Sequence, residues 1–176
     1  MNIPWTAVAT IGALITSTTA IVALVIEGRR SRIALQTDLL MTYYDKFYSP
    51  EMKQLRKTAA EKLLLNQFPN FELEDVLDYF GIIAVLLQRK VIDFKLAFGL
   101  FDWWILRYWG CAERYIQTRR EDAMDPDMEM WTVLEGMVTQ LGAHRIKKES
   151  PEISEDCLKR FLFEESRALP HTGPAS

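Results

Sequence analysis

The chain has 176 residues, of which 49% are hydrophobic and 26% are charged, and its net charge is −3. This length leaves room for one domain with a substantial core, and the composition excludes a chain that is disordered throughout. The negative net charge argues against nucleic acid as a partner, because nucleic-acid-binding domains usually carry an excess of basic residues. The averages conceal an uneven distribution, since no ionisable side chain occurs before Glu27.

An uncharged run of 24 residues covers residues 3–26. An apolar helix needs about 20 residues to cross a bilayer, so the run predicts a transmembrane anchor over residues 1–28 that contacts lipid through residues 3–26. Basic residues follow the run directly, whereas no Lys or Arg precedes it. The positive-inside rule therefore predicts a single-pass protein of the cell inner membrane, with its N-terminus outside and the later residues in the cytoplasm. A cleaved signal peptide is disfavoured, because its basic residues would come before the apolar run. The juxtamembrane basic residues are Arg29, Arg30 and Arg32.

The remaining residues carry signals for a series of helices. Hydrophobic residues at helical spacing indicate a juxtamembrane helix over residues 29–48 that continues the anchor with little interruption. A capping side chain, a proline and an acid follow one another at three places, beginning at Ser49, Asp125 and Ser150. This order is typical of a helix N-terminus. The third helix is expected to carry an apolar stripe that starts at Ile153.

No segment indicates a strand with confidence, so the sequence predicts an all-α fold. Residues 66–70 are the clearest loop, and the helix after them has an uncharged centre that suits burial. We expect a single N-terminal transmembrane helix followed by a cytoplasmic bundle of about five to six helices. The expected divisions are the anchor at 1–28, the juxtamembrane helix at 29–48, the cytoplasmic helical domain at 49–168 and a disordered tail at 169–176.

Residues 101–110, FDWWILRYWG, place five aromatic residues on one predicted helix that Asp93 caps. Helical spacing puts four of the five on one broad face. Aromatic side chains bury about 150–250 Å² each, so this face predicts the core of the bundle. A membrane-interface belt is disfavoured because Asp102 and Arg107 interrupt the aromatic run, and a base-stacking platform would need basic neighbours on the same face.

Trp103 is the exception, because helical spacing places it opposite the aromatic face. The strip around it is a candidate interface for a second copy of the chain or another protein, since Trp and Arg often dominate binding energy. Two alternatives stay open, namely a simple stacking pair between Trp103 and Arg107 and cover by the juxtamembrane helix. The members of the strip are Leu96, Leu100, Trp103, Leu106 and Arg107.

Arg119 falls at the end of the aromatic face, where an unpaired charge would be unfavourable. A carboxylate is therefore expected beside it, and Asp78 or Asp75 on the preceding helix are the candidates for a buried ion pair. A functional anion site is the alternative.

Motifs of known chemistry are not found in the sequence. It has no phosphate-binding glycine loop, no nucleophile elbow and no Cys/His spacing of a zinc site. We therefore expect that the protein binds no cofactor and no metal and that it is not an enzyme. Its only cysteines, Cys111 and Cys157, are expected to be reduced core residues. The sequence thus predicts a membrane-tethered cytoplasmic helical interaction module, acting as a scaffold, sensor or effector. The alternatives are an oligomeric or pore-forming membrane effector that acts through its transmembrane helix, and an enzyme whose site is assembled from scattered side chains.

Four segments resemble an uncharacterised bacterial family that is defined as a domain of unknown function. They are FYSPEMKQLR at residues 47–56, DYFGIIA at 78–84, KVID at 90–93 and YWGCAERYIQTRR at 108–120. The resemblance implies a short protein with one N-terminal transmembrane helix and a cytoplasmic helical domain. It implies no catalytic residues.

Overall fold

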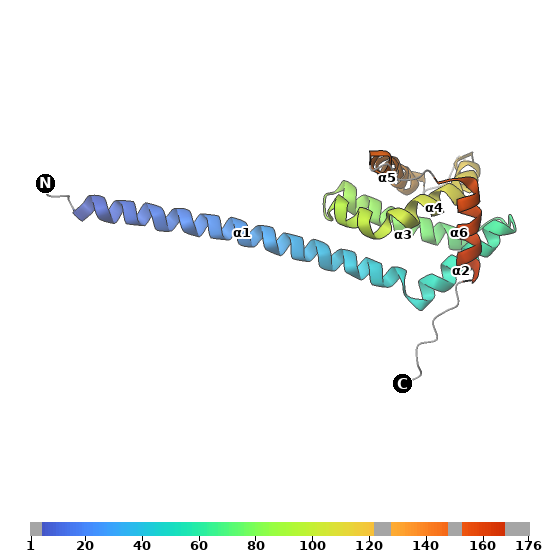
Figure 1. Cartoon of the computed structure of the whole chain (residues 1–176), viewed down its shortest axis with the longest axis horizontal. Coiled ribbons are helices and arrows are strands. Elements are labelled where there is room, and N and C mark those ends of the chain that lie inside the picture. The colour runs from blue at the N-terminus through green and yellow to red at the C-terminus, as the bar shows by residue number, and fades with distance from the viewer. Residues whose placement is uncertain (1–4, 122–127, 148–152, 168–176) are drawn as a thin grey trace, which may run out of the picture. The chain divides into compact units, whose positions relative to one another are not determined.

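The structure, a computed structural model, describes residues 5–121, 128–147 and 153–167, and the side chains of residues 22–121, 131–147 and 153–167. These residues form six helices and no strand, which confirms the predicted all-α fold for the described part of the chain. In chain order the helices are α1 (Trp5–Phe47), α2 (Pro50–Leu64), α3 (Phe71–Gln88), α4 (Phe94–Glu121), α5 (Met128–Lys147) and α6 (Glu155–Arg167) (Figure 1).

The first helix, α1, runs unbroken for 43 residues. The chain divides into two units, residues 1–39 and a compact unit from Leu40 to Ser176. Arg29, Arg30 and Arg32 lie on α1 within the first unit and are exposed. Over the residues that the structure describes, no helix is both long enough and apolar enough to cross a membrane.

Capping side chains fix the starts of α2 and α4 where the sequence predicts them. The Ser49 hydroxyl accepts a hydrogen bond from the backbone N–H of Met52 at 3.2 Å. The Asp93 carboxylate accepts from the backbone N–H groups of Lys95 and Leu96 at 2.9 and 3.1 Å. Each cap satisfies N–H groups that the first helical turn leaves without a partner.

The loop at residues 66–70 is held by the buried side chain of Asn70. Its amide oxygen accepts from the backbone N–H of Leu73 and so caps α3, while its amide nitrogen donates to the carbonyl of Ala59 on α2, each at 3.1 Å. One side chain therefore fixes the turn between the two helices.

The start of α6 differs from expectation. The helix begins at Glu155, and the hydroxyl of Ser154 caps it by accepting from the backbone N–H of Cys157 at 3.3 Å. Ile153, expected on the helix, lies before it, because Ser154 supplies a cap closer to the apolar stripe. The two proline-containing signals that begin at Asp125 and Ser150 lie outside the described residues.

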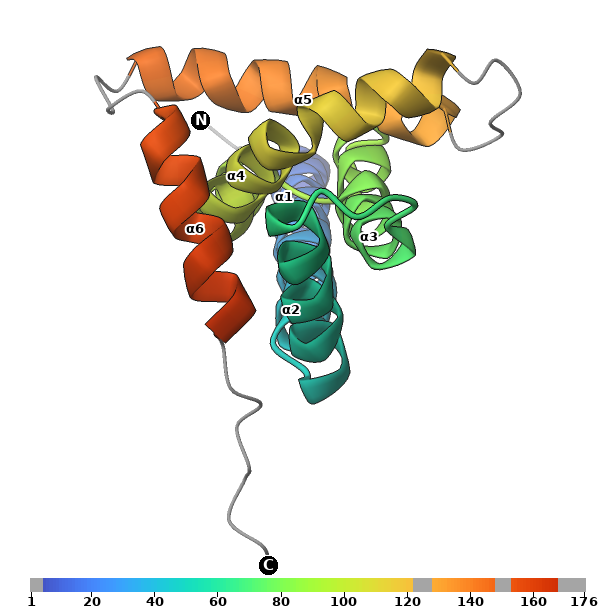
Figure 2. The same cartoon turned by 90° about the vertical axis from the view of Figure 1, so that its right-hand side faces the viewer.

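Within the compact unit, α2 packs against α3 and α6, while α4 packs against α3, α5 and α6. Figure 2 shows α5 running across one end of this unit, where it contacts α3 and α4. The last turns of α1 belong to the unit, and the buried ring of Phe47 lies 5.0 Å from Trp104 and 5.5 Å from Phe80 between ring centroids. The largest fully buried side chains include Trp131, Tyr108, Phe47, Phe80 and Phe101.

The aromatic segment of α4 is core, as predicted. Phe101 and Tyr108 are fully buried, and Trp104 and Trp109 are half-buried. Trp103, predicted to lie on the other side, remains 38% exposed. Helical spacing alone thus separated the buried aromatic residues from the exposed one.

Candidate functional site

A charged residue is buried on α2. Apolar residues recur at helical spacing along this helix at Met52, Leu55, Ala59 and Leu63, which predicts an apolar stripe facing the core, but Leu55 and Leu63 are only half-buried. The helix packs against both α3 and α6, so its buried side extends beyond a single apolar stripe. As a result Arg56 is 3% exposed. The buried residues of α2 are Met52, Arg56, Ala59 and Ala60.

Arg56 meets Glu165 of α6 and, through it, Tyr108 of α4. The distance from Arg56 Nη1 to Glu165 Oε2 is 3.6 Å, and the two side chains are 4% and 9% exposed. The Tyr108 hydroxyl donates a hydrogen bond of 2.6 Å to the same glutamate oxygen. Three helices therefore converge on one carboxylate, and we call these residues the buried Arg–Glu–Tyr cluster.

Aromatic rings surround the Arg56 guanidinium. Its central carbon lies 4.1 Å from the Phe47 ring centroid and 4.6 Å from that of Trp104, within the range of cation–π attraction. Among the described residues, Arg56 Nε and Nη1 have no hydrogen-bond partner. The charge is thus held by one carboxylate and by ring faces, an arrangement in which loss of the carboxylate would leave a buried charge uncompensated.

The surroundings of Tyr108 keep its phenol neutral. Burial raises the pKa of Tyr108 well above its ordinary value, and the neighbouring Glu165 carboxylate raises the pKa further by its charge and its hydrogen bond. Tyr108 is therefore a hydrogen-bond donor at neutral pH rather than a base. This tyrosine therefore does not provide a general base near neutral pH.

A second cluster of the same chemistry lies where α3 meets α4. Arg119 Nε is 3.3 Å from Glu74 Oε1, with the two side chains 32% and 14% exposed. The Tyr115 hydroxyl donates to the same glutamate oxygen. Burial raises the pKa of Tyr115 first, and its hydrogen bond to Glu74 raises it further. We call this set the open Arg–Glu–Tyr cluster.

The structure thus shows Glu74 beside Arg119, and a pair between Arg119 and Asp78 or Asp75 stays a prediction. Asp78 accepts a hydrogen bond of 3.2 Å from Trp131 Nε1, and Asp75 is exposed. Glu74 precedes Asp78 by about one helical turn, and its longer side chain reaches α4 at the level of Arg119 and Tyr115. Arg119 is part-buried, so its pair with Glu74 is a partly exposed one.

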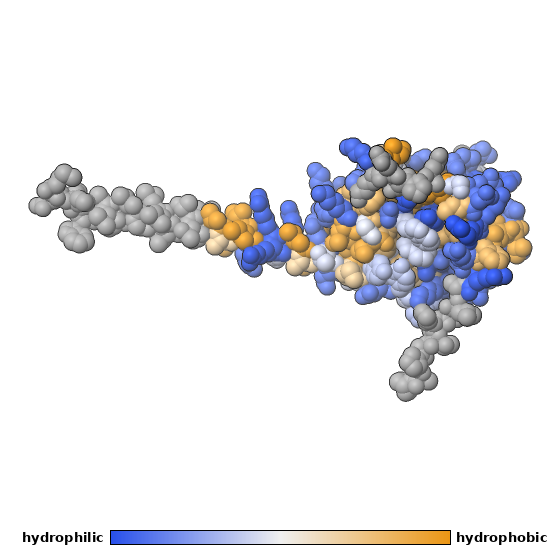
Figure 3. Space-filling view, in the orientation of Figure 1, coloured by the Kyte–Doolittle hydropathy of each residue, from blue (hydrophilic) through white to orange (hydrophobic). Residues whose placement is uncertain are grey.

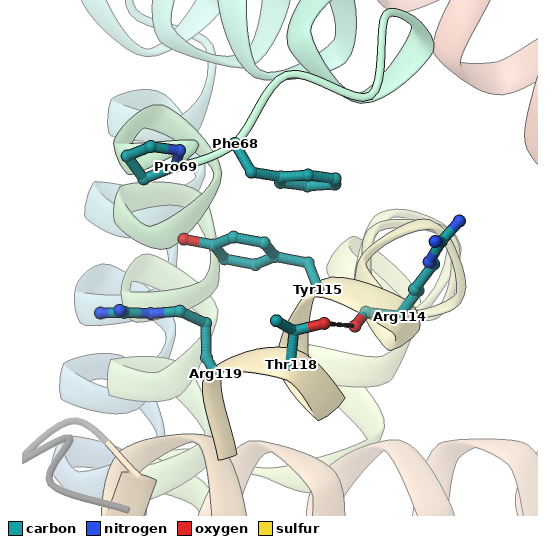
Figure 4. A pocket seen from close by; sticks show the side chains of 6 residues that line it. All are labelled: Phe68, Pro69, Arg114, Tyr115, Thr118 and Arg119. Carbon is teal, nitrogen blue, oxygen red and sulfur yellow. Dashed lines mark hydrogen bonds between the residues drawn. The ribbon is translucent and has the colours of Figure 1, made fainter. Parts of the chain in front are cut away.

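An open pocket of about 440 Å³ adjoins this cluster. The ring of Phe68 stacks on Tyr115 with centroids 5.3 Å apart and an angle of 16° between the planes. Figure 4 shows Arg114 and Arg119 extending in different directions, one on each side of Tyr115. The volume falls in the range of small-ligand pockets. The lining residues are Phe68, Pro69, Arg114, Tyr115, Thr118 and Arg119.

Exposed apolar side chains gather at the same end of the compact unit. Figure 3 shows them over the end where α2 passes into α3. We call this group the apolar corner. A concentration of large exposed hydrophobic residues is a feature of interaction sites, whereas single ones are ordinary. Its members are Leu64, Leu65, Phe68 and Phe71, with exposed fractions of 40%, 66%, 48% and 61%.

The strip around Trp103 is brought together only in part. The Arg107 guanidinium carbon lies 4.0 Å from the Trp103 ring centroid, so the two residues do form a stacking pair. Phe161 of α6 meets the same indole ring edge-on at 5.3 Å. The strip members Leu96, Leu100 and Leu106 are half-buried. The helix shown against Trp103 is therefore α6, which sequence reasoning did not consider, and an interface at this strip stays a prediction.

The two cysteines are free, half-buried thiols. Burial raises the pKa of Cys111 to about 12. A thiol with so high a pKa is a poor nucleophile. Within the described residues, no group of three or more His, Cys, Asp or Glu side chains is arranged to hold a metal ion.

Over the described residues, the chain is a small all-α protein with one Arg–Glu–Tyr cluster in its core and a second, more open one beside a surface pocket. It belongs to the family described as Domain of unknown function (DUF4760), whose model matches residues 7–141. The predicted membership of an uncharacterised family is thereby confirmed. No curated protein and no solved structure matches the chain. The helix α6 lies beyond the matched residues.

Sequence reasoning missed the buried cluster, although signals for it were present. Arg56 is four residues from Met52 and from Ala60, so it lies on the buried face of α2. Glu165 likewise follows Phe161 and Leu162 at helical spacing. A charged residue inside each of two apolar stripes, with opposite signs, is the pattern that could have identified the pair.

Proposed function

We propose that this protein is a membrane-tethered helical interaction module without catalytic activity. The single observation that carries the interaction role is the apolar corner beside the open pocket. Four large apolar side chains are exposed there next to two arginines, which gives a surface able to bind a protein partner. The family membership is compatible with this role, since the family carries no assigned activity.

The tether rests on the sequence of the first unit. Residues 3–26 carry no charge and are long enough to span a bilayer. α1 is helical from Trp5 onwards, and in the same unbroken helix Leu40 and Phe47 belong to the core of the compact unit. Arg29, Arg30 and Arg32 favour an orientation with the compact unit in the cytoplasm.

Membrane extraction tests the tether. The full chain should remain in the membrane pellet after alkaline carbonate extraction. Replacing Leu14 and Ile15 together by Arg should release it, because each central arginine opposes insertion by about 2.5–3.5 kcal/mol. The control is Ile33→Arg, at a position 62% exposed and beyond the uncharged run, which should stay in the pellet. Recovery of the wild-type chain in the supernatant would contradict the tether.

Reporter fusions test the orientation. A fluorescent protein fused after Ser176 should fold and fluoresce, and alkaline phosphatase at the same position should be inactive. Phosphatase activity from that fusion would place the compact unit on the other side and contradict the proposed topology.

Site-specific photo-crosslinking tests the interaction role. A photoreactive residue at Leu65 or Phe71 of the full-length chain in membranes should yield discrete protein adducts. The same residue at the exposed Glu113 on α4 is the control. If both corner positions give no more adduct than the control, the apolar corner does not bind a protein.

A further inference from the structure

The apolar corner is held in place by contacts beneath it. The loop that carries Phe68 is fixed by the buried side chain of Asn70, which hydrogen-bonds to backbone groups of both α2 and α3. The Phe68 ring stacks on the buried Tyr115, and the Tyr115 hydroxyl in turn donates to Glu74. A surface that is ordered before a partner arrives loses little conformational freedom on binding. The corner is therefore a preformed surface.

Two cations near the corner are already balanced by carboxylates of the same chain. Lys62, close to the end of α2, forms an ion pair with Glu72 at the start of α3. Arg119, which lines the pocket, forms one with Glu74. Each of these pairs joins two helices, so its cation is matched within the fold.

Arg114, the other arginine of the pocket, is not matched in this way. Its side chain is exposed, and no carboxylate among the residues that the structure describes pairs with its guanidinium. Figure 4 shows it extending away from Arg119, on the other side of Tyr115. A guanidinium can hold a carboxylate through two parallel hydrogen bonds, and Arg is enriched at protein interfaces. An unmatched positive charge beside exposed apolar side chains is complementary to an acid that lies beside apolar residues.

We propose that the apolar corner and Arg114 together bind a segment of another protein that carries a carboxylate side chain next to large apolar side chains. The inference rests on the proposed function, because it names the chemistry of the partner at the same surface. An apolar side chain of the partner packs against Phe68 in the pocket, and the neighbouring carboxylate meets the Arg114 guanidinium. The apolar contact supplies most of the affinity, and the charge pair fixes the direction of the segment.

The exposure and charge of this surface favour a protein segment over a small molecule or a membrane. Most of the lining residues are themselves exposed, whereas a small-molecule pocket buries about 70–90% of its ligand. Anionic membrane surfaces are recognised by clusters of about four to eight Lys or Arg residues. Of the two arginines that line this pocket, one is paired with Glu74. The exposed lining residues are Phe68, Pro69, Arg114 and Thr118.

Peptide selection followed by a charge exchange tests the proposal. A phage library of random short peptides is selected on the full-length chain in detergent, and the enriched peptides should carry Asp or Glu beside aromatic or aliphatic residues. Arg114→Glu should weaken the binding of such a peptide at least tenfold, because it places two like charges together. Replacing the acid of the peptide by Lys should restore binding to this variant and weaken binding to the wild type.

Arg160→Glu is the matched control. Arg160 is an exposed arginine of α6, outside the set of residues that line the pocket. This variant should bind the acidic peptide as the wild type does. The helical signal and melting temperature of Arg114→Glu should equal those of the wild type, because the substituted side chain is exposed.

Failure of this inference is distinguishable from failure of the proposed function. If the selected peptides lose binding with Leu65→Ser and Phe71→Ser but bind Arg114→Glu as tightly as the wild type, the corner binds protein and the acidic partner is wrong. If no peptide is enriched whose binding depends on the corner, the proposed function and this inference both fail. Lipid adducts in place of protein adducts from the photoreactive residue at Leu65 would assign the corner to a membrane surface and also overturn the proposal.

Discussion

The compact unit contains two clusters of identical chemistry in different surroundings. In each, a tyrosine of α4 donates its hydroxyl to a glutamate that also meets an arginine. In the buried cluster the arginine and glutamate side chains are 4% and 9% exposed. In the open cluster they are 32% and 14% exposed and adjoin a pocket. The buried set is Arg56, Glu165 and Tyr108, and the open set is Arg119, Glu74 and Tyr115.

This difference teaches that burial, rather than the identity of the groups, decides what such a cluster does. Water screens the open pair, so its net contribution to folding is small and its arginine side chain remains partly available at the pocket. The buried pair has lost its hydration, and each charge depends on the other. The buried cluster therefore fastens α6 to α2 and α4, whereas the open one lines a surface.

The largest effect is expected for Glu165→Ala. It leaves the Arg56 guanidinium buried without its carboxylate, and removal of one partner of a buried pair typically costs about 3–5 kcal/mol. Urea unfolding of the full chain in detergent measures this loss. Glu164→Ala, at the exposed neighbouring position, should change stability by no more than about 0.5 kcal/mol. A loss below about 1 kcal/mol for Glu165→Ala would show that the buried pair does not fasten α6.

The second-largest effect is expected from alkaline pH, which should weaken the buried cluster. The pKa of Tyr108 in the folded chain is raised above the value of 10.0 expected when unfolded, chiefly by burial. Its contribution to stability is therefore complete below pH 10 and is lost as the pH rises above that value, because the unfolded chain releases the proton more readily.

Urea unfolding at several values above pH 10 should show stability falling with pH in the wild type. In Tyr108→Phe the slope should be shallower by up to about 1.4 kcal/mol per pH unit, the contribution of one proton. Part of the slope should remain, since the pKa values of Tyr79 and Tyr115 are also raised. Identical slopes in the two chains would mean that Tyr108 loses its proton as easily when folded as when unfolded.

The smallest effect is expected at the open cluster. Glu74→Ala removes a part-exposed ion pair and one tyrosine hydrogen bond, so the loss of unfolding free energy should be about 1 kcal/mol. Asp75→Ala, at the neighbouring exposed position, is the matched control and should be near neutral. A loss as large as that of Glu165→Ala would remove the distinction between the two clusters.

Periodic apolar patterns and helix caps could be predicted from the sequence because they are local. Ser49 and Asp93 cap the helices that they were expected to cap. The all-α class and the buried face of α4 follow from residues that are neighbours along one helix, and no knowledge of packing is needed to identify them.

The pairing of charges could not be predicted, because it depends on how helices far apart in the sequence come together. Arg56 and Glu165 lie on α2 and α6, and only the packing of those helices brings them within 3.6 Å. Arg119 was expected to meet a carboxylate on α3, and the structure shows it beside Glu74 of that helix, which was not among the named candidates. Choosing among acids one turn apart requires the axial register of α3 against α4, which sequence alone does not supply.

Double-mutant cycles on the two pairs compare the clusters most directly. Arg56→Met with Glu165→Leu forms one cycle, and Arg119→Met with Glu74→Leu forms the other, each measured by urea unfolding. We expect a coupling energy of about 2–3 kcal/mol for the buried pair, with the double variant more stable than either single one. The open pair should couple by less than about 1 kcal/mol. Equal coupling energies, or a larger one for Arg119 and Glu74, would contradict the conclusion that burial under α6 separates the two clusters.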